Sequence, residues 1–268
     1  MIRIGILGAT GYTALELIKL LLRHPEARIA VLTSRQQGEP HVATVHPGLV
    51  GRLDLRLRDL NPDQVAAECD CVFSCLPHGA SAQAVKPLVE AGVRVVDFSA
   101  DYRLSDLAVY RHWYEDTHCD AGRLGGVPYG LPELFADQIA PAPLVANPGC
   151  YPTSAILAVW PLLKGGLVEP AGIIFDSKSG VSGAGRTPKL GTHFPECNES
   201  FSAYNVGKHR HNPEIDQVLG AAAGQRIETI FTPHLVPMNR GILTTAYAVP
   251  TWDVTEAELM DALRAAYR

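Results

Sequence analysis

One cysteine stands where a thiol can act as a nucleophile. Cys150 follows the apolar run Leu144–Ala146 and precedes a segment with helical spacing that begins near Pro152. A thiol at a helix start is stabilised as the thiolate by the helix dipole and the unpaired backbone N–H groups. Pro148 and Gly149 bend the backbone just before it. This placement indicates covalent catalysis, with a buried structural cysteine as the alternative.

A histidine-rich segment offers the base that such a thiol needs. His209, Arg210 and His211 precede Asn212–Pro213, which is typical of a helix start with Asn212 as the N-cap. Positive charge is disfavoured at a helix N-terminus, so we expect His211 to stay neutral and to accept a proton. The alternatives are a metal site on the His-x-His pair and a solvated basic loop.

Two glycines near the N-terminus have the spacing of a phosphate-binding turn. Gly8 and Gly11 follow the apolar run Arg3–Leu7 and open a helical segment, with Ala14 where the usual fingerprint has a third small residue. Such a turn lets the backbone approach a pyrophosphate, which then lies at the helix N-terminus. A plain strand–turn–helix connection is the alternative.

The residues after the second predicted strand favour NADP over NAD. Enzymes that use NAD usually place Asp or Glu there to bind the ribose 2′-hydroxyl. This chain has Thr33, Ser34 and Arg35, whose hydroxyl and guanidinium groups suit a 2′-phosphate. A solvated surface arginine is the alternative.

A second glycine-rich stretch, residues 177–186, follows another predicted strand. Its small residues let the backbone approach a flat ring, and its hydroxyl and N–H groups suit phosphate or carboxamide. A flexible surface loop is the alternative.

Strands and helices alternate along the first hundred residues. This alternation indicates parallel βαβ units in an α/β, Rossmann-type doubly wound parallel sheet. Residues 36–51 and 101–143 are predicted to be rich in loops. The predicted strands are 3–7, 29–32, 71–76, 93–98 and 144–146, and the predicted helices are 13–23, 62–68 and 80–91.

The second half of the chain follows a different pattern. A helix at 153–163, strands at 173–177, 227–232 and 242–249, and a short helix after Asn212 indicate an α+β substrate and dimerisation domain. We expect domains at 1–147, binding NADP, and at 148–268, catalytic and oligomeric. A capping box at Thr255–Glu258 opens a helix that stops at Arg268 with no following strand, which favours a chain truncated at its C-terminal end.

Composition narrows the function classes. The chain has 268 residues, 47% of them hydrophobic and 19% charged, as in a globular protein with a core. A net charge of -5 argues against nucleic-acid and membrane partners. With no signal peptide or membrane span visible, we expect a cytoplasmic protein with reduced cysteines. Cys69, Cys71 and Cys75 lie around an apolar strand without zinc spacing, so no metal is predicted.

Longer motifs carry a family resemblance. They run in order over the whole chain, which closely resembles the N-acetyl-γ-glutamyl-phosphate reductase family of arginine biosynthesis. The motifs are Gly-Ala-Thr-Gly-Tyr-Thr at 8–13, Leu-Pro-His-Gly at 76–79, and the stretches 97–103, 129–134, 147–153, 179–186, 209–214 and 233–241.

The resemblance implies a two-domain relative of aspartate-semialdehyde dehydrogenase that works as a homo-oligomer, a dimer or a tetramer. It implies that NADPH reduces N-acetyl-γ-glutamyl phosphate to N-acetylglutamate 5-semialdehyde, with release of inorganic phosphate. Cys150 falls on the family's nucleophile and His211 on its acid/base, with His209 left open for that role. The family also continues past the position of Arg268, with strands and a helix that returns to the nucleotide domain.

The resemblance further assigns binding positions. The substrate positions are Arg103, Asn147, Ser179, His209 and Glu214. The cofactor positions are Gly8, Thr10, Gly11, Tyr12, Thr13, Ser34, Arg35, Leu76, Pro77, Ser182, Gly183, Ala184 and Gly185.

Three other functions stay open. The first is a sibling reductase that acts on aspartyl phosphate or on a carrier-bound aminoadipyl phosphate. The second is a catalytically silent protein that binds NADP. The third is a cysteine hydrolase, which needs no nucleotide and leaves the turn at Gly8 unexplained.

Overall fold

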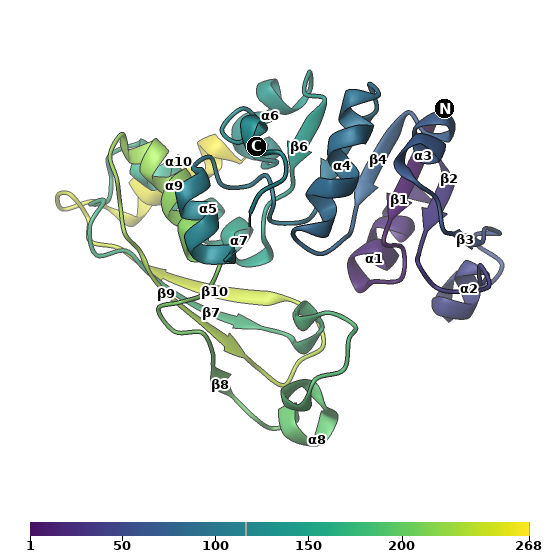
Figure 1. Ribbon diagram of the computed structural model, residues 1–268. Coiled ribbons are helices and arrows are strands. Elements are labelled where there is room, and N and C mark those ends of the chain that lie inside the picture. The colour runs from purple at the N-terminus through teal and green to yellow at the C-terminus, as the bar shows by residue number, and fades with distance from the viewer. Residues whose placement is uncertain (116, 268) are drawn as a thin grey trace. The chain divides into compact units, whose positions relative to one another are not determined.

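In the computed structural model, which describes residues 1–115 and 117–267, the apolar runs of the first half form one parallel sheet. Its order is β3-β2-β1-β4-β5-β6, the Rossmann arrangement in which the strand order reverses between β1 and β4. The predicted doubly wound sheet is confirmed (Figure 1). The strands are β1 (Ile2–Leu7), β2 (Ala27–Thr33), β3 (Leu57–Arg58), β4 (Cys71–Ser74), β5 (Arg94–Asp97) and β6 (Leu144–Ala146).

Helices cover both faces of this sheet and create two apolar cores. One core joins Ile18 of α1 to Ile6 of β1, and the other joins Val85 of α4 to Val72 of β4. Burying such side chains is the main favourable contribution to folding. The helices are α1 (Tyr12–Leu21), α2 (Val42–Val45), α3 (Pro62–Glu68), α4 (Ala80–Glu90), α5 (Leu107–Tyr114) and α6 (Pro132–Ile139), with 3₁₀ helices η1 (Pro47–Leu49) and η2 (Ala121–Arg123).

The two stretches predicted to be rich in loops contain regular structure. Helices α5 and α6 lie within 101–143, and α2 and η1 lie within 36–51. Asp106 caps α5 by accepting from the N–H of Ala108, and the buried side of α5 is formed by Tyr110 and Tyr114. An aromatic core face on a short helix gives no aliphatic 3.6-residue pattern, so sequence reasoning missed it.

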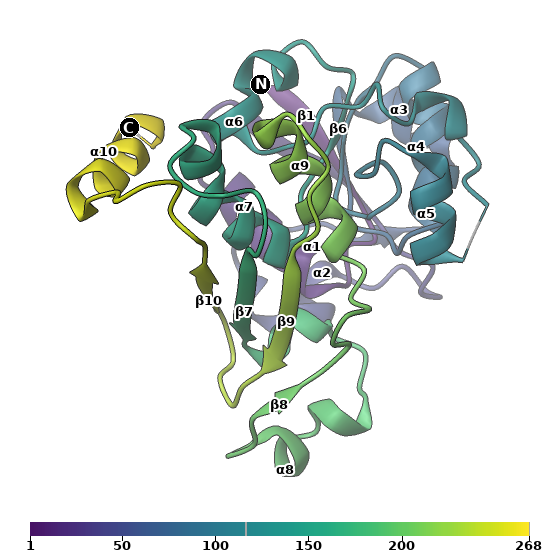
Figure 2. The same ribbon diagram turned by 90° about the vertical axis from the view of Figure 1, so that its left-hand side faces the viewer.

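The second half forms a mixed four-stranded sheet of order β10-β7-β9-β8, in keeping with the predicted α+β architecture (Figure 2). The chain divides into two compact units, Met1–Asn147 and Pro148–Arg268. None of the described helices is long and apolar enough to span a membrane. The elements of the second unit are α7 (Cys150–Lys164), β7 (Ile174–Ser179), η3 (Val181–Ala184), η4 (Leu190–Thr192), α8 (Phe194–Cys197), β8 (Ser202–Ala203), α9 (Asn212–Ala223), β9 (Ile230–Leu235), β10 (Ile242–Tyr247) and α10 (Glu256–Ala266).

Strand β9 lies further along the chain than predicted. The predicted strand ended at residue 232, whereas β9 continues through Pro233 to Leu235. Proline lacks the N–H that a ladder needs and is rare inside strands. Its carbonyl still accepts a hydrogen bond from the N–H of Tyr204 at 3.1 Å.

This mixed sheet has one covered face and one open face. Phe175 and Ser177 of β7 are buried on the covered face, where Tyr151 of α7 packs on Phe231 with ring centroids 5.2 Å apart. The hydroxyl of Thr244 on β10 lies 2.8 Å from that of Ser177. The alternate residues of β7, β9 and β10 point to the open face, where several large apolar side chains are exposed.

Candidate active site

Cys150 is the first residue of α7, and its side chain is exposed. Gly149 is the N-cap in an extended conformation, and its carbonyl accepts from the Thr153 hydroxyl at 2.8 Å. The helix therefore begins two residues before the predicted start near Pro152. This places the thiol among the first-turn N–H groups at the positive end of the helix dipole.

The core cysteines have the opposite environment. Burial raises the pKa of Cys69 to about 11 and that of Cys75 to about 12. Burial also raises the pKa of Cys71. Their thiols stay protonated and act as small apolar side chains. In the described part of the chain, no three His, Cys, Asp or Glu side chains are grouped to hold a metal ion.

Glu214 ties the start of α9 to the nucleophile segment. Its side chain is 1% exposed, and its carboxylate accepts the N–H of Gly149 at 2.7 Å. A hydrogen bond between a buried carboxylate and a backbone N–H is among the stronger kinds. Glu214 thus holds the residue that precedes Cys150.

The two histidines are in contact, and their local roles differ. Their ring centroids are 4.8 Å apart, and the backbone N–H of His211 donates to Nδ1 of His209 at 3.1 Å. Burial, followed by the nearby His211, lowers the pKa of His209 to about 4. A backbone N–H can only donate, so Nδ1 of neutral His209 carries the lone pair and Nε2 carries the proton.

Aromatic side chains surround this histidine pair. The rings of Tyr151, Tyr204 and Phe231 each lie within 5.7 Å of the His209 ring, centroid to centroid. The hydroxyls of Tyr151 and Tyr204 are 2.8 Å apart, and burial raises the pKa of both. Sequence reasoning missed this cluster because its members are up to 80 positions apart; only Tyr151, beside Cys150, gave a local signal.

Asn212 does not cap α9 as predicted. It is the first helical residue, and the N-cap is His211, whose side chain forms no capping hydrogen bond. The Asn212 amide instead donates to Asp216 at 2.9 Å, one turn further along the helix. His211 still lies at the N-terminus of the helix, where a protonated imidazole is disfavoured.

Arg103 is held by backbone carbonyls within the first unit. It is 9% exposed; its Nε donates to Asn147 O and its Nη2 to Phe98 O, each at 2.8 Å. The guanidinium therefore links the ends of β5 and β6. In the second unit, the predicted substrate residue Ser179 is 5% exposed and donates to Gly180 O at 3.0 Å.

The turn from Gly8 to Gly11 fits a dinucleotide phosphate. Gly8 has φ +72, and an added Cβ would lie 2.9 Å from Cys75 O, so both backbone shape and packing require glycine. Gly11 has φ −78, and an added Cβ would meet only Gly8 O, at 4.0 Å. The missing side chain at Gly11 thus leaves open space at the start of α1, where an anion is favoured.

The other predicted nucleotide residues of the first unit lie at neighbouring strand ends. The N–H of Ala9 donates to Thr33 O at 2.9 Å, so the end of β2, followed by Ser34 and exposed Arg35, adjoins the turn. The Leu76 side chain approaches Gly8. Thr10, Tyr12 and Thr13 belong to the turn or to α1, and Pro77 follows Leu76.

The predicted nicotinamide loop is bonded to its own unit. The N–H of Val181 donates to Met238 O at 2.8 Å, and the N–H of Ser182 donates to Asn239 O at 3.1 Å. The Ser182 hydroxyl donates to the same carbonyl. Gly183 and Gly185 donate their N–H groups within η3, which also contains Ala184. The N–H groups of Val181, Ser182, Gly183 and Gly185 and the Ser182 hydroxyl therefore already donate hydrogen bonds within this unit.

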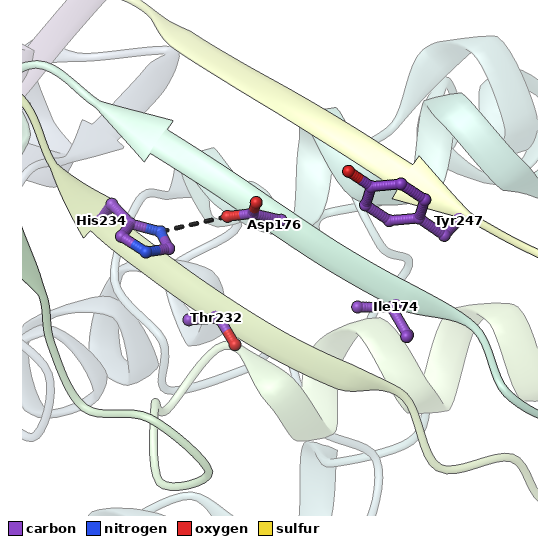
Figure 3. Close-up of a pocket in the computed structure, with 5 residues that line it drawn as sticks. All are labelled: Ile174, Asp176, Thr232, His234 and Tyr247. Carbon is purple, nitrogen blue, oxygen red and sulfur yellow. Dashed lines mark ion pairs between the residues drawn. The ribbon is translucent and has the colours of Figure 1, made fainter.

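A cavity of about 420 Å³ lies elsewhere, on the open face of the mixed sheet. Figure 3 shows its lining from three strands, with His234 and Asp176 turned toward each other. Nδ1 of His234 lies 3.1 Å from Asp176 Oδ1, and Lys178 Nζ lies 2.7 Å from the other oxygen. None of the predicted site residues lines this cavity, whose other lining residues are Ile174, Thr232 and Tyr247.

Comparison with known proteins covers both units. Residues 3–142 match the NAD-binding domain of semialdehyde dehydrogenases, and residues 150–268 match their dimerisation domain. An N-acetyl-gamma-glutamyl-phosphate reductase of Rhodopirellula baltica is 56% identical over 264 residues, which is 98% of this chain and 76% of that protein. One from Symbiobacterium thermophilum is 49% identical over 267 residues, covering 99% of this chain and 76% of its own length.

Solved structures show the same fold at low identity. The aspartate semialdehyde dehydrogenase of Candida albicans, crystallised with NADP, superposes with a TM-score of 0.74 at 18% identity. The match covers 98% of this chain and 76% of that one. The corresponding enzyme II of Vibrio cholerae gives a TM-score of 0.73 at 15% identity, over 100% of this chain and 80% of its own.

Proposed function

Because the chain belongs to the N-acetyl-gamma-glutamyl-phosphate reductase family of semialdehyde dehydrogenases, we propose that it reduces N-acetyl-γ-glutamyl phosphate with NADPH in arginine biosynthesis. The products are N-acetylglutamate 5-semialdehyde and inorganic phosphate. The observation that carries the proposal is the exposed thiol at the first position of α7. None of the six cysteines is joined in a disulfide, and this suits the cytoplasm as the proposed compartment.

Cys150 forms and releases the covalent intermediate. Its thiolate attacks the acyl carbon, the C–O bond to phosphate breaks, and inorganic phosphate leaves. A dinucleotide held by the turn from Gly8 to Gly11 would supply the hydride that reduces the resulting thioester. Collapse of the thiohemiacetal then breaks the C–S bond, which gives the aldehyde and the free thiolate. The first-turn N–H groups of α7 favour the negative charge on sulfur.

His211 is the proposed acid/base. It takes the proton of Cys150 before attack and returns a proton to the thiolate when the aldehyde leaves. His209 is unsuited to this role, because its Nδ1 already accepts from the N–H of His211 and its Nε2 carries the proton. The proposal therefore gives His209 the task of orienting the His211 backbone. Glu214 holds the segment that carries Cys150 through the N–H of Gly149.

Arg103, Asn147 and Ser179 are proposed to lie near the bound substrate. Inorganic phosphate is the expected leaving group and the co-substrate of the reverse reaction. Arg35 and Ser34, which follow β2, are proposed to bind the 2′-phosphate of NADP, because a guanidinium can bind phosphate in a bidentate manner.

Phosphate-dependent reduction of NADP by N-acetylglutamate semialdehyde tests the activity. We expect turnover with NADP, and we expect Arg35→Ala to raise the KM for NADP about tenfold while barely changing that for NAD. Arg28→Ala is the matched control, since Arg28 is an exposed arginine near the start of β2, the strand that Arg35 follows. Turnover only with the semialdehyde of aspartate or of aminoadipate would contradict the proposal that N-acetylglutamate semialdehyde is the substrate. Binding of NADPH without any turnover would indicate a silent nucleotide-binding protein.

The open face of the mixed sheet is the proposed contact with a second copy of the chain. The match to a dimerisation domain indicates a homo-oligomer, and this face exposes large apolar side chains. Uncovered apolar patches of this kind usually mark interaction surfaces. The side chains and their exposed fractions are Ile174 at 36%, Ile230 at 58%, Leu243 at 65% and Tyr247 at 53%.

Leu243→Asp is expected to convert the oligomer to a smaller species in sedimentation velocity, because it would bury a carboxylate against apolar side chains. Val50→Asp is the control, since Val50 is 70% exposed in the other unit. An unchanged sedimentation coefficient for Leu243→Asp would place the interface elsewhere.

A further inference from the structure

A buried histidine outside the catalytic segment contacts the nucleotide turn. His46 joins α2 to η1 and is 4% exposed. Its Nε2 lies 2.8 Å from the carbonyl oxygen of Ala9, inside the turn from Gly8 to Gly11. A carbonyl oxygen can only accept, so Nε2 carries a proton and donates it to Ala9.

This hydrogen bond fixes the direction of a neighbouring N–H. A trans peptide is planar, so the carbonyl of one residue and the N–H of the next point in opposite directions. With the Ala9 carbonyl turned toward His46, the Thr10 N–H points away from it. The preceding peptide is fixed independently, because the N–H of Ala9 donates to Thr33 O at 2.9 Å.

The restraint matters because rotation about ψ of Ala9 and φ of Thr10 turns this peptide over as a rigid plane. A rotated Ala9–Thr10 peptide would present a carbonyl, which repels phosphate, in place of an N–H, which binds it.

We propose that His46 is a positioning residue for cofactor binding, which holds the Ala9–Thr10 peptide so that its N–H faces a phosphate of the dinucleotide. The inference rests on the proposed use of NADPH and deepens it. His46 does not itself touch the cofactor in this account; it acts through the Ala9 carbonyl.

The fold of this segment does not depend on the hydrogen bond of His46. Val42 and Leu49, on either side of His46, are each 0% exposed and belong to the apolar core beneath α1. Burial of two aliphatic side chains anchors α2 and η1. A variant without the donor should therefore keep the segment folded and lose only the restraint on the turn.

The test separates binding of the pyrophosphate from binding of the 2′-phosphate. His46→Leu removes the donor, and we expect the Kd for NADPH, from fluorescence titration, to rise about tenfold. The Kd for adenosine 2′-phosphate, which has no pyrophosphate, should stay within about twofold. His46→Gln restores an N–H donor at a similar reach and should recover most of the NADPH affinity. An effect that came only from a loosened fold would change both ligands and would not be rescued.

His41→Leu is the matched control. His41 caps α2 through Nδ1, and its Nε2 pairs with Asp54 at 3.0 Å near the surface. Losing this cap should lower the melting temperature and leave the NADPH Kd unchanged. An unchanged NADPH Kd in His46→Leu, or an equal loss of both ligands, would overturn the proposal.

Hydrogen exchange in the unmodified chain gives a reading that needs no variant. Binding of NADPH should slow hydrogen exchange of the Thr10 amide relative to the protein without ligand, whereas binding of adenosine 2′-phosphate should not. Equal exchange rates with the two ligands would contradict the inference. These measurements are independent of turnover. A chain that binds NADPH as described but reduces no acyl phosphate would overturn the proposed reaction alone, whereas a chain that binds no NADPH would overturn both.

Discussion

Cys150→Ser is expected to lower kcat by at least about 10³-fold while leaving the Kd for NADPH nearly unchanged. A serine hydroxyl at the start of α7 stays protonated at neutral pH, because the dipole that favours a thiolate cannot ionise an alcohol. The acyl-phosphate carbon then lacks its nucleophile. Steady-state turnover and fluorescence titration with NADPH measure the two quantities separately.

Cys119→Ser is the control, since Cys119 is also exposed but lies in the first unit, in the turn before η2 and not at the first position of an α-helix. Its kcat and NADPH affinity should match those of the unmodified chain. Turnover of Cys150→Ser within about tenfold of the unmodified rate would exclude a thioester on this residue.

His211→Gln is expected to lower kcat by about 10²–10⁴-fold, the usual contribution of a general acid/base. The expected loss for His209→Asn is about tenfold or less, because the asparagine carbonyl replaces Nδ1 as the acceptor for the His211 N–H. Parallel kcat measurements on the two variants distinguish the residues. A larger loss in His209→Asn than in His211→Gln would reverse the assignment.

The pH dependence of stability gives a second signature of His209. Its pKa in the folded chain is about 4, below the ordinary 6.5 of an unfolded chain. Between these values the unfolded chain binds a proton that the folded chain does not, so the free energy of unfolding falls as pH decreases from about 6.5 toward 4. In His209→Asn this part of the slope should vanish, as urea titrations at pH 7 and pH 5 would show. An unchanged slope would mean that the histidine is not desolvated.

The nucleotide half of the fold was predictable from local patterns. Buried parallel strands appear in the sequence as short, continuously apolar runs. The turn at Gly8 requires glycine for its backbone shape and its packing. Both features can therefore be recognised from a few adjacent residues. The nucleophile was predictable for the same reason, because a helix start depends on the residues around Cys150. Short helices with aromatic faces, such as α5, lack the aliphatic period and were missed.

The contacts that refine the site join distant residues. The hydrogen bond from the His211 N–H to His209 decides which imidazole can act as the acid/base. The sequence pattern His-x-His alone allows either histidine to have this role. The pairing of Glu214 with Gly149 spans 65 positions, and the contact of His46 with Ala9 spans 37. Such pairings depend on how whole elements pack, which no local pattern encodes.

The raised pKa values of the core cysteines have a consequence for oxidative damage. With pKa values of about 11 and 12, Cys69 and Cys75 are ionised in only about one molecule in 10⁴ or fewer at pH 7. Peroxides attack the thiolate, so these two sulfurs would be spared. The exposed Cys150 at a helix start is the more vulnerable. Under mild oxidant the protein would lose its activity while its core stayed intact. A thiol reductant that reverses the first oxidation state would restore the activity.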